Sequence, residues 1–386
     1  MESGPVWSDL RPDDPEYALR LVDRILKAAA ERRASDIHLH PRADHWEILF
    51  RLDGVLCVIG RVPRSSLTDP VTRLMVLANI PTYKAGQPME GRLSQSTRDV
   101  EMRLGTFPTV HGIRAVVRLF AATDELVTIE HLGLSKDIVE SLVELSESRD
   151  GAVLLTGPAG SGKTTTLYAC LRYIARMTPR RSVLTIEDPI ESVIESISQS
   201  QLQPAIGMTL ASSLRSAVRQ DPEVLLVSEI RDVETAEAVL MSSLTGHLVF
   251  SSLHAGDVTT ALRRLVQMNL PTYLLRSGLR AICCQRLLRK RCKSCDLQTQ
   301  PECARCIGTG YYGRIAIAEL LRLDRGEVGE EMMRRLTAGD SAHQLYTSAE
   351  KDGMLTLRQR AWQLVDSGIT DEREVYRVLG RSGSKP

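Results

Sequence analysis

One glycine-rich segment carries the residues best suited to chemistry. It reads Gly157-Pro-Ala-Gly-Ser-Gly162-Lys163-Thr164 and fits the pattern G-x-x-x-x-G-K-[ST]. In this pattern backbone N–H groups close around a β-phosphate, and the N-terminus of the next helix adds positive potential. We expect Lys163 to neutralise β- and γ-phosphate oxygens and the Thr164 hydroxyl to bind Mg²⁺. The predicted nucleotide-binding residues are Gly157, Pro158, Ala159, Gly160, Ser161, Gly162, Lys163, Thr164 and Thr165.

The surroundings of this loop favour the same interpretation. An apolar run, 152–155, precedes it and a helical pattern, 165–174, follows it, so the strand–loop–helix context of a phosphate loop is predicted. A glycine-rich loop that binds nothing is the weaker alternative.

Two acidic positions are candidates for holding magnesium and orienting an attacking water. Glu229 ends the apolar run 224–228, and Glu187 with Asp188 ends the run 183–186. Acidic residues at the carboxyl ends of buried strands lie where α/β sheets bind ligands. A solvated strand end is the alternative for either residue alone. Beside a phosphate loop, Glu229 and Glu187 become candidate catalytic residues.

Four of the eight cysteines form two closely spaced pairs. These are Cys292-x-x-Cys295 and Cys303-x-x-Cys306. Each pair can direct two thiolates at one tetrahedral ion, and four thiolates leave no open position, so the spacing predicts a structural Zn²⁺ site. Free thiols or disulfides are the alternatives. Removal of zinc is expected to loosen residues 290–314, because metal binding is coupled to local folding.

The elements that position these residues fall into two groups. Residues 1–120 predict a small α+β domain, with a helix over 15–33 and strands over 46–52, 55–59, 100–104 and 113–119. The dipeptide Asp53-Gly54 predicts a hairpin turn between the first two strands. Alternation places Arg103 and Arg118 on the polar faces of neighbouring strands.

The second group begins near residue 136. Four short apolar runs, 153–156, 183–187, 224–228 and 248–252, alternate with helical patterns, which predicts a doubly wound α/β sheet. The basic segment 285–291 is interpreted as a helix end beside the cysteines, with a nucleic-acid patch as the alternative. Residues 315–380 are predicted to be mostly helical.

Composition excludes several classes of protein. The chain has 386 residues, a net charge of +1 and 4% aromatic residues, so it lacks the bulk charge and the stacking residues that favour nucleic-acid binding. No apolar stretch reaches the ~18 residues of a membrane span, and residues 1–15 do not read as a secretory signal. We therefore expect a cytoplasmic protein that binds no nucleic acid.

Several further motifs occur in a fixed order along the chain. They are Thr185-Ile-Glu187-Asp188-Pro189, Arg219-Gln-Asp-Pro222, Glu229-Ile-Arg231-Asp232, Thr245-Gly-His247 and Ser252-Leu-His254. With the phosphate loop, this order resembles the secretion ATPase family of type II secretion and type IV pilus systems. The resemblance covers about residues 30–370, and the cysteine quartet is more similar to the secretion and pilus-assembly branch than to the retraction branch. Ser228, Ser252 and Ala255 depart from the family pattern.

The resemblance implies a domain plan. It implies a PAS-like N-terminal domain (1–120), a linker (121–135), a RecA-like P-loop domain (136–289), a zinc-binding insert (290–314) and a helical C-terminal segment (315–386).

The resemblance also implies a set of catalytic residues and two cofactors, ATP and Mg²⁺. Arginines at the positions of Arg103, Arg118, Arg219 and Arg314 reach phosphates, with a surface salt bridge as the alternative for each. His247 and His254 are expected to sense the γ-phosphate, with a buried structural histidine as the alternative. The expected catalytic residues are Glu229, Glu187, Arg103, Arg118, Arg219, Arg314, His254 and His247, with Thr164 and Glu229 on Mg²⁺.

The expected function is that of an ATP-hydrolysing motor. The resemblance implies a homo-hexamer that acts on inner-membrane platform proteins and associates peripherally with the membrane through them. A pilus-retraction motor and a nucleic-acid-translocating ATPase are alternatives. A non-catalytic nucleotide-dependent scaffold is a third, supported only by Ser228.

Overall fold

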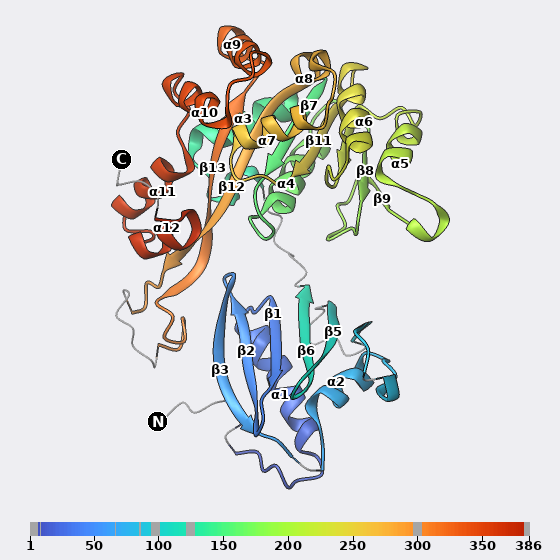
Figure 1. Cartoon of the computed structure of the whole chain (residues 1–386), viewed down its shortest axis with the longest axis vertical. Coiled ribbons are helices and arrows are strands. Elements are labelled where there is room, and N and C mark those ends of the chain that lie inside the picture. The colour runs from blue at the N-terminus through green and yellow to red at the C-terminus, as the bar shows by residue number, and fades with distance from the viewer. Residues whose placement is uncertain are drawn as a thin grey trace. The chain divides into compact units, whose positions relative to one another are not determined.

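The computed structural model divides the chain into two compact units, one of residues 1–124 with 300–308 and the other of residues 125–299 and 309–386 (Figure 1). It describes Trp7 and residues 9–65, 67–84, 86–93, 101–120, 128–295 and 303–381. Each unit has its own sheet and its own apolar core.

The first unit is a six-stranded antiparallel sheet backed by helices α1 (Tyr17–Glu31) and α2 (Pro70–Leu77). Its strand order is β3-β2-β1-β6-β5-β4. The strands are β1 (Asp36–Pro41), β2 (His45–Leu52), β3 (Val55–Pro63), β4 (Met89–Arg92), β5 (Glu101–Thr109) and β6 (Gly112–Phe120).

Local sequence explains most of this unit. The predicted hairpin joins β2 to β3, with positive φ at Asp53 and Gly54 as its tight turn requires. Asp69 caps α2 by accepting hydrogen bonds from the N–H groups of Val71 and Thr72. Strand β1, which the sequence analysis did not predict, occupies the centre of the sheet between β2 and β6.

The second unit is a seven-stranded sheet with the order β13-β12-β7-β11-β10-β8-β9. Strands β7 (Gly151–Thr156), β8 (Val183–Glu187), β10 (Val224–Val227) and β11 (Leu248–Leu253) are the four predicted runs, and they pair in parallel. β9 (Ser198–Gln201) adds one edge. Helices α3 (Lys136–Glu147), α4 (Lys163–Ala175), α5 (Leu210–Ala217), α6 (Val233–Leu244), α7 (Val258–Gln267) and α8 (Thr272–Gly278) accompany the sheet.

Two long strands complete the other edge of the sheet. β12 (Leu279–Arg291) runs parallel to β7, and β13 (Tyr311–Arg322) runs antiparallel to β12. The helix predicted at 285–291 is therefore wrong, and residues 315–322 are strand. The reason is burial: the stretch 281–285 is buried on both of its faces between two cores, so tertiary packing overrides the helical interpretation of the basic residues that follow.

Four helices end the described chain, namely α9 (Gly326–Thr337), α10 (Ala342–Lys351), α11 (Leu357–Asp366) and α12 (Glu372–Leu379). Capping boxes start two of them, Ser341 with Gln344 and Thr356 with Gln359. The last of them, α12, is joined to β12 by a buried ion pair between Arg289 and Glu374, with N–O distances of 2.8 and 3.0 Å.

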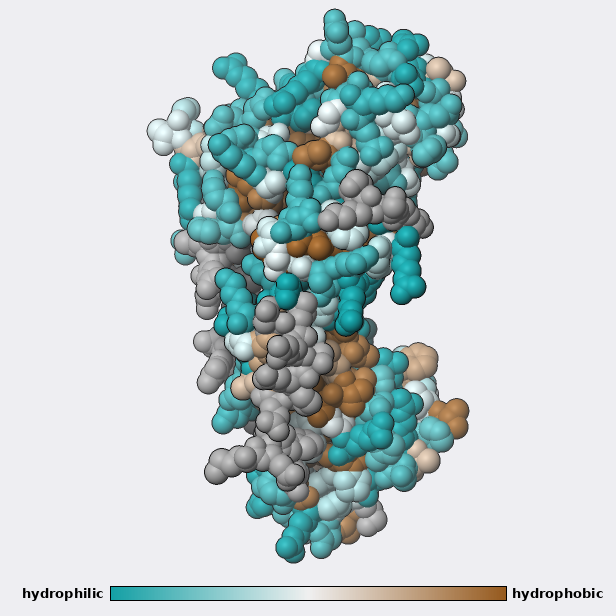
Figure 2. Space-filling view, turned by 90° about the vertical axis from the view of Figure 1, so that its left-hand side faces the viewer, coloured by the Kyte–Doolittle hydropathy of each residue, from teal (hydrophilic) through white to brown (hydrophobic). Residues whose placement is uncertain are grey.

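Apolar side chains are gathered inside the two units. In the second unit, Ala152 and Leu154 of β7 point into one core and Val153 and Leu155 into the other. On the face drawn in Figure 2 hydrophilic side chains predominate, and apolar ones form separate patches. Among the described residues no helix combines the length and apolarity needed to cross a bilayer.

We predict that protonation of His38 destabilises the first unit. Its imidazole is buried, its Nδ1 lies 3.3 Å from Arg114 Nη2, and burial, with Arg114 and Arg51 nearby, lowers the pKa of His38 to about 4, which Asp36 opposes. In the unfolded chain the pKa of His38 is about 6.5, so between this pH and about 4 the unfolded chain binds a proton that the folded chain does not. The free energy of unfolding should therefore fall as the pH decreases from 7.5 to 5, by on the order of 1–2 kcal/mol.

Urea unfolding followed by tryptophan fluorescence in a Trp362→Phe background reports on this unit alone, because Trp7 and Trp46 both lie in it. His38→Gln should flatten the pH dependence, whereas substitution of the exposed His343 should not. Equal pH dependence in wild type and His38→Gln would contradict the prediction.

Candidate functional site

The phosphate loop lies where the sequence predicts it, between β7 and α4. Gly157, Gly160 and Gly162 have φ values of 144°, 73° and 88°, which residues with a Cβ rarely adopt. Lys163 Nζ donates to the carbonyl oxygens of Gly157 and Pro158 at 2.9 and 3.1 Å. Its ammonium group therefore already faces the concave side of the loop.

The loop rests against β12. The Gln285 amide is buried, donates to Ser161 O at 2.8 Å and accepts from Thr166 Oγ1 at 2.8 Å. A Cβ on Gly162 would lie 2.7 Å from Gln285 Nε2, so this glycine is required by close packing as well as by φ. The sequence analysis missed Gln285, because it read this segment as a helix.

Glu229 and His254 meet at the same edge of the sheet. They follow β10 and β11, which are parallel to β7, and His254 Nε2 lies 3.0 Å from Glu229 Oε1. Burial lowers the pKa of Lys163, and the nearby Glu229 carboxylate opposes that shift. The structure thus brings the phosphate loop, Glu229 and His254 together.

Arg231 completes the charge pattern beside Glu229. Its guanidinium lies 3.2 Å from Glu229 and 3.3 Å from Asp188, so it joins the two acidic strand ends. The motif containing Arg231 was noticed in the sequence, but this role was not predicted.

Glu187 is placed differently from Glu229. It is 2% exposed and accepts hydrogen bonds from Tyr168 Oη, from Thr185 Oγ1 at 2.5 Å and from Gln199 Nε2 at 3.0 Å. Burial, together with the bond to Glu187, raises the pKa of Tyr168. This carboxylate is therefore held inside the protein behind the strand end, where it supports neighbouring elements.

A third carboxylate, Glu191, lies nearer the loop and was missed. Thr164 Oγ1 is 3.5 Å from Glu191 Oε1, and desolvation, with Glu187 nearby, raises the pKa of Glu191. In the sequence, the only indication of a role for Glu191 is its position four residues after Glu187.

The serines that depart from the family pattern contact one another. Ser252 Oγ donates to Ser228 O at 2.7 Å, and Ser228 N donates to Ile186 O at 3.0 Å. The two serines therefore add hydrogen bonds between the ends of adjacent strands, and Glu229 still lies at the carboxyl end of β10.

Two predicted site residues lie at the opposite side of this sheet, where the parallel strands begin. His247 precedes β11, and its Nδ1 lies 3.0 Å from Ser242 O. A six-residue strand separates it from His254, which is roughly 20 Å. Arg219 follows α5, precedes β10 and is exposed. The structure does not bring these two residues to the phosphate loop of the same chain.

The remaining predicted arginines lie on the strands β13, β5 and β6. Arg314 lies opposite Arg289 in the β12–β13 ladder, beyond Gln285 and Arg286 along β12. Arg103 and Arg118 belong to the first unit, where they face each other across β5 and β6. Arg118 Nε lies 3.1 Å from Asp36, and Arg103 Nε lies 3.3 Å from Glu101.

The four cysteines come together at the end of the β12–β13 hairpin. The sulfurs of Cys292, Cys295, Cys303 and Cys306 lie within 4.8 Å of one another. A tetrahedral ion with Zn–S bonds of ~2.3 Å needs sulfurs ~3.8 Å apart, so this cluster fits a metal ion. Cys170 and Cys283 are buried elsewhere, and burial raises the pKa of both thiols.

Comparison with known proteins identifies the family. The model of the type II/IV secretion system protein family matches residues 12–377, and the chain belongs to this family. The chain is 36% identical over 397 residues to the type IV pilus assembly ATPase TfpB of Acinetobacter baylyi, covering 95% of this chain and 66% of TfpB. It therefore spans slightly less than two thirds of that relative.

Two other proteins are similar over most of their length. The type II secretion system protein HxcR of Pseudomonas aeruginosa is 36% identical over 387 residues, covering 98% of this chain and 81% of HxcR. The structure of the pilus retraction motor PilT with bound ADP has a TM-score of 0.63 and 27% identity, covering 92% of this chain and 95% of PilT. The fold is thus that of a RecA-like secretion ATPase.

We predict that Glu187→Gln affects stability more than nucleotide binding. The change weakens charge-assisted bonds to Tyr168, Thr185 and Gln199, which should lower the free energy of unfolding by about 1–3 kcal/mol. Urea unfolding measures the loss, and Glu195→Gln, at an exposed glutamate, is the matched control. Wild-type stability combined with abolished turnover would show instead that Glu187 acts directly in the reaction.

Proposed function

We propose that this chain is a Mg²⁺-dependent ATPase that converts ATP to ADP and phosphate and drives type II secretion or type IV pilus assembly. The observation that carries the proposal is the meeting of the phosphate loop, Glu229 and His254 at one edge of the second unit's sheet. The names of the relatives TfpB and HxcR support the assignment to pilus assembly or secretion.

Each group at this edge has a role in the proposed reaction. Lys163 exchanges its two loop carbonyls for β- and γ-phosphate oxygens, and Thr164 with Glu229 holds Mg²⁺. Glu229 also orients the attacking water, and His254, whose Nε2 lies 3.0 Å from Glu229 Oε1, responds to the γ-phosphate. Glu187 holds Tyr168, Thr185 and Gln199 in place, and Glu191 holds the side chain of Thr164. The bound ADP of PilT supports nucleotide binding by this fold.

The proposed assembly is a homo-hexameric ring acting on inner-membrane platform proteins. Arg219 and His247 lie at the far edge of the sheet, so in this proposal they act on nucleotide only if it is bound to another copy. In a ring in which each chain completes its neighbour's site, Arg219 and His247 can contact the nucleotide that the neighbour binds. Arg103, Arg118 and Arg314 remain proposed phosphate ligands.

A pilus-retraction motor is the second candidate. The similarity to PilT favours it, whereas the cysteine cluster favours the assembly and secretion branch. Nucleic-acid translocation is less favoured by the near-neutral charge, and stimulation of turnover by DNA would revive it. Steady-state release of phosphate separates all of these motors from a non-catalytic scaffold.

Two substitutions test the proposed activity. Lys163→Ala should weaken binding of a fluorescent ATP analogue at least about tenfold, because the loop loses its cation. Glu229→Gln should retain binding but reduce turnover on the order of 10²–10³-fold. The exposed Lys136→Ala is the control. Turnover of Glu229→Gln at the wild-type rate would refute the role of this carboxylate.

Zinc binding by the four cysteines is tested by metal analysis. We expect one Zn²⁺ per chain, lost in Cys303→Ser and in Cys306→Ser but kept in Cys57→Ser, whose thiol lies outside the cluster. Chelation should increase proteolysis within 290–314, since metal and local fold are coupled. A chain purified without metal whose hairpin resists proteolysis equally would exclude a structural zinc.

A further inference from the structure

Side chains of three neighbouring elements, α7, β7 and β12, hold the loop after β11 by its backbone. We call residues 254–257 the histidine loop. Its successive carbonyl oxygens accept from different donors: His254 O from Arg264 Nη1 at 2.6 Å, Ala255 O from Thr156 Oγ1 at 3.4 Å, and Gly256 O from Arg286 Nη2 at 2.6 Å. The loop carries little apolar surface that could fix it by burial, since His254 and Gly256 are exposed.

Arg286 lies beside the phosphate loop and donates to the histidine loop. Cys284 pairs with Thr156, so Arg286 comes just beyond the end of β7, beside Gly157. Arg286 Nη1 donates to Gln285 O at 3.0 Å, and a Cβ on Gly157 would lie 3.2 Å from this nitrogen. No described carboxylate forms an ion pair with Arg286, and its guanidinium donates to two backbone carbonyls and to Cys284 Sγ at 3.3 Å.

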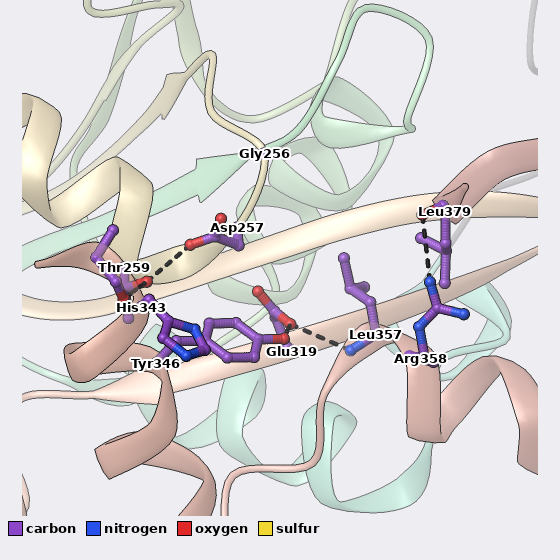
Figure 3. A pocket seen from close by; sticks show the side chains of 10 residues that line it. Gly256, Asp257, Thr259, Glu319, His343, Tyr346, Leu357, Arg358 and Leu379 are labelled. Carbon is purple, nitrogen blue, oxygen red and sulfur yellow. Dashed lines mark hydrogen bonds between the residues drawn. The ribbon is translucent and has the colours of Figure 1, made fainter. Parts of the chain in front are cut away.

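The far side of the histidine loop is fixed by a different residue. Glu319, with no exposed surface, accepts from Val258 N at 3.1 Å, Leu357 N at 3.1 Å and Tyr346 Oη at 2.7 Å (Figure 3). Asp257 caps α7 by accepting from Thr260 N at 2.7 Å. These bonds join the start of α7 to α10 and α11.

Between these fixed points the loop borders open space. Gly256 and Asp257 line a cavity of about 410 Å³ whose other walls include Glu319, His343, Tyr346 and Leu357 (Figure 3). If Arg286 is removed, Gly256 O keeps only the weak thiol donor of Cys284, at 3.4 Å. His254 O and Ala255 O keep their donors, but the loop loses its bond at Gly256, beside the cavity, and gains room to move there.

We propose that Arg286 is a positioning residue that holds the histidine loop against the phosphate loop and so keeps His254 aligned with Glu229. This inference deepens the proposed ATPase function and rests on it. Arg286 acts through Gly256 and requires no contact with the nucleotide. The fork of arginine serves this purpose better than a lysine, because it bonds two carbonyls at fixed geometry.

Kinetics of Arg286→Ala and Arg286→Lys give the first test. We expect kcat to fall about tenfold or more in Arg286→Ala, with partial recovery in Arg286→Lys, while KM and the affinity for a fluorescent ATP analogue stay within about threefold. The matched control is Arg263→Ala, because Arg263 also donates to a backbone carbonyl, Asp340 O at 2.6 Å, and should leave kcat unchanged. An affinity loss of tenfold would make Arg286 a phosphate ligand and overturn the proposal, as would an unchanged kcat.

Hydrogen–deuterium exchange without nucleotide gives a test independent of activity. Amides of residues 254–260 should exchange faster in Arg286→Ala than in wild type or Arg263→Ala, with thermal midpoints alike. Unchanged exchange overturns the proposal. If the wild-type chain hydrolyses no ATP, the proposed function fails, while the exchange result still decides whether Arg286 holds the loop.

Discussion

Burial of β7 on both faces is the constraint on which the nucleotide site depends. A strand between two apolar cores has no face left for polar side chains, and every residue of β7 is buried. Polar groups must therefore follow its carboxyl end, and the same holds for β10 and β11 beside it. Parallel pairing then brings the phosphate loop, Glu229 and His254 to one edge, since strands of equal direction end together.

The polar residues near the carboxyl ends of these strands form two groups. One group faces solvent, and the other is buried and supports the first. Glu229 and His254 are partly exposed and contact each other, whereas Glu187, Gln285 and Glu319 are buried with all their partners inside the protein. A buried carboxylate or amide is costly unless it is fully hydrogen-bonded, so each of these residues fixes the backbone that it contacts. The supporting polar groups thus explain why the exposed ones keep their positions.

Features with a local signal can be predicted from the sequence alone. The phosphate loop, the Asp53-Gly54 hairpin and four parallel strands follow from turn chemistry and from short apolar runs, which need no knowledge of distant contacts. Glu229 could be placed for the same reason, since it directly follows an apolar run.

The sequence alone fails where distant partners decide the outcome. β12 reads as a basic helix until its neighbours β7 and β13 are known, and Gln285 and Arg286 were hidden by that error. The burial of Glu187 depends on Tyr168 and Gln199, which the sequence does not place beside it. Likewise, the edge of the sheet at which Arg219 and His247 lie follows from strand direction, which is a property of the sheet as a whole.

The β12–β13 ladder also connects features that appear separate in the sequence. Cys284 is level with the end of β7, Arg289 forms the buried ion pair with Glu374 of α12, and Cys292 begins the cysteine cluster. All three lie on one strand and its direct continuation. One continuous length of backbone therefore joins the cysteine cluster and the contact with α12 to Gln285 and Arg286 beside the phosphate loop.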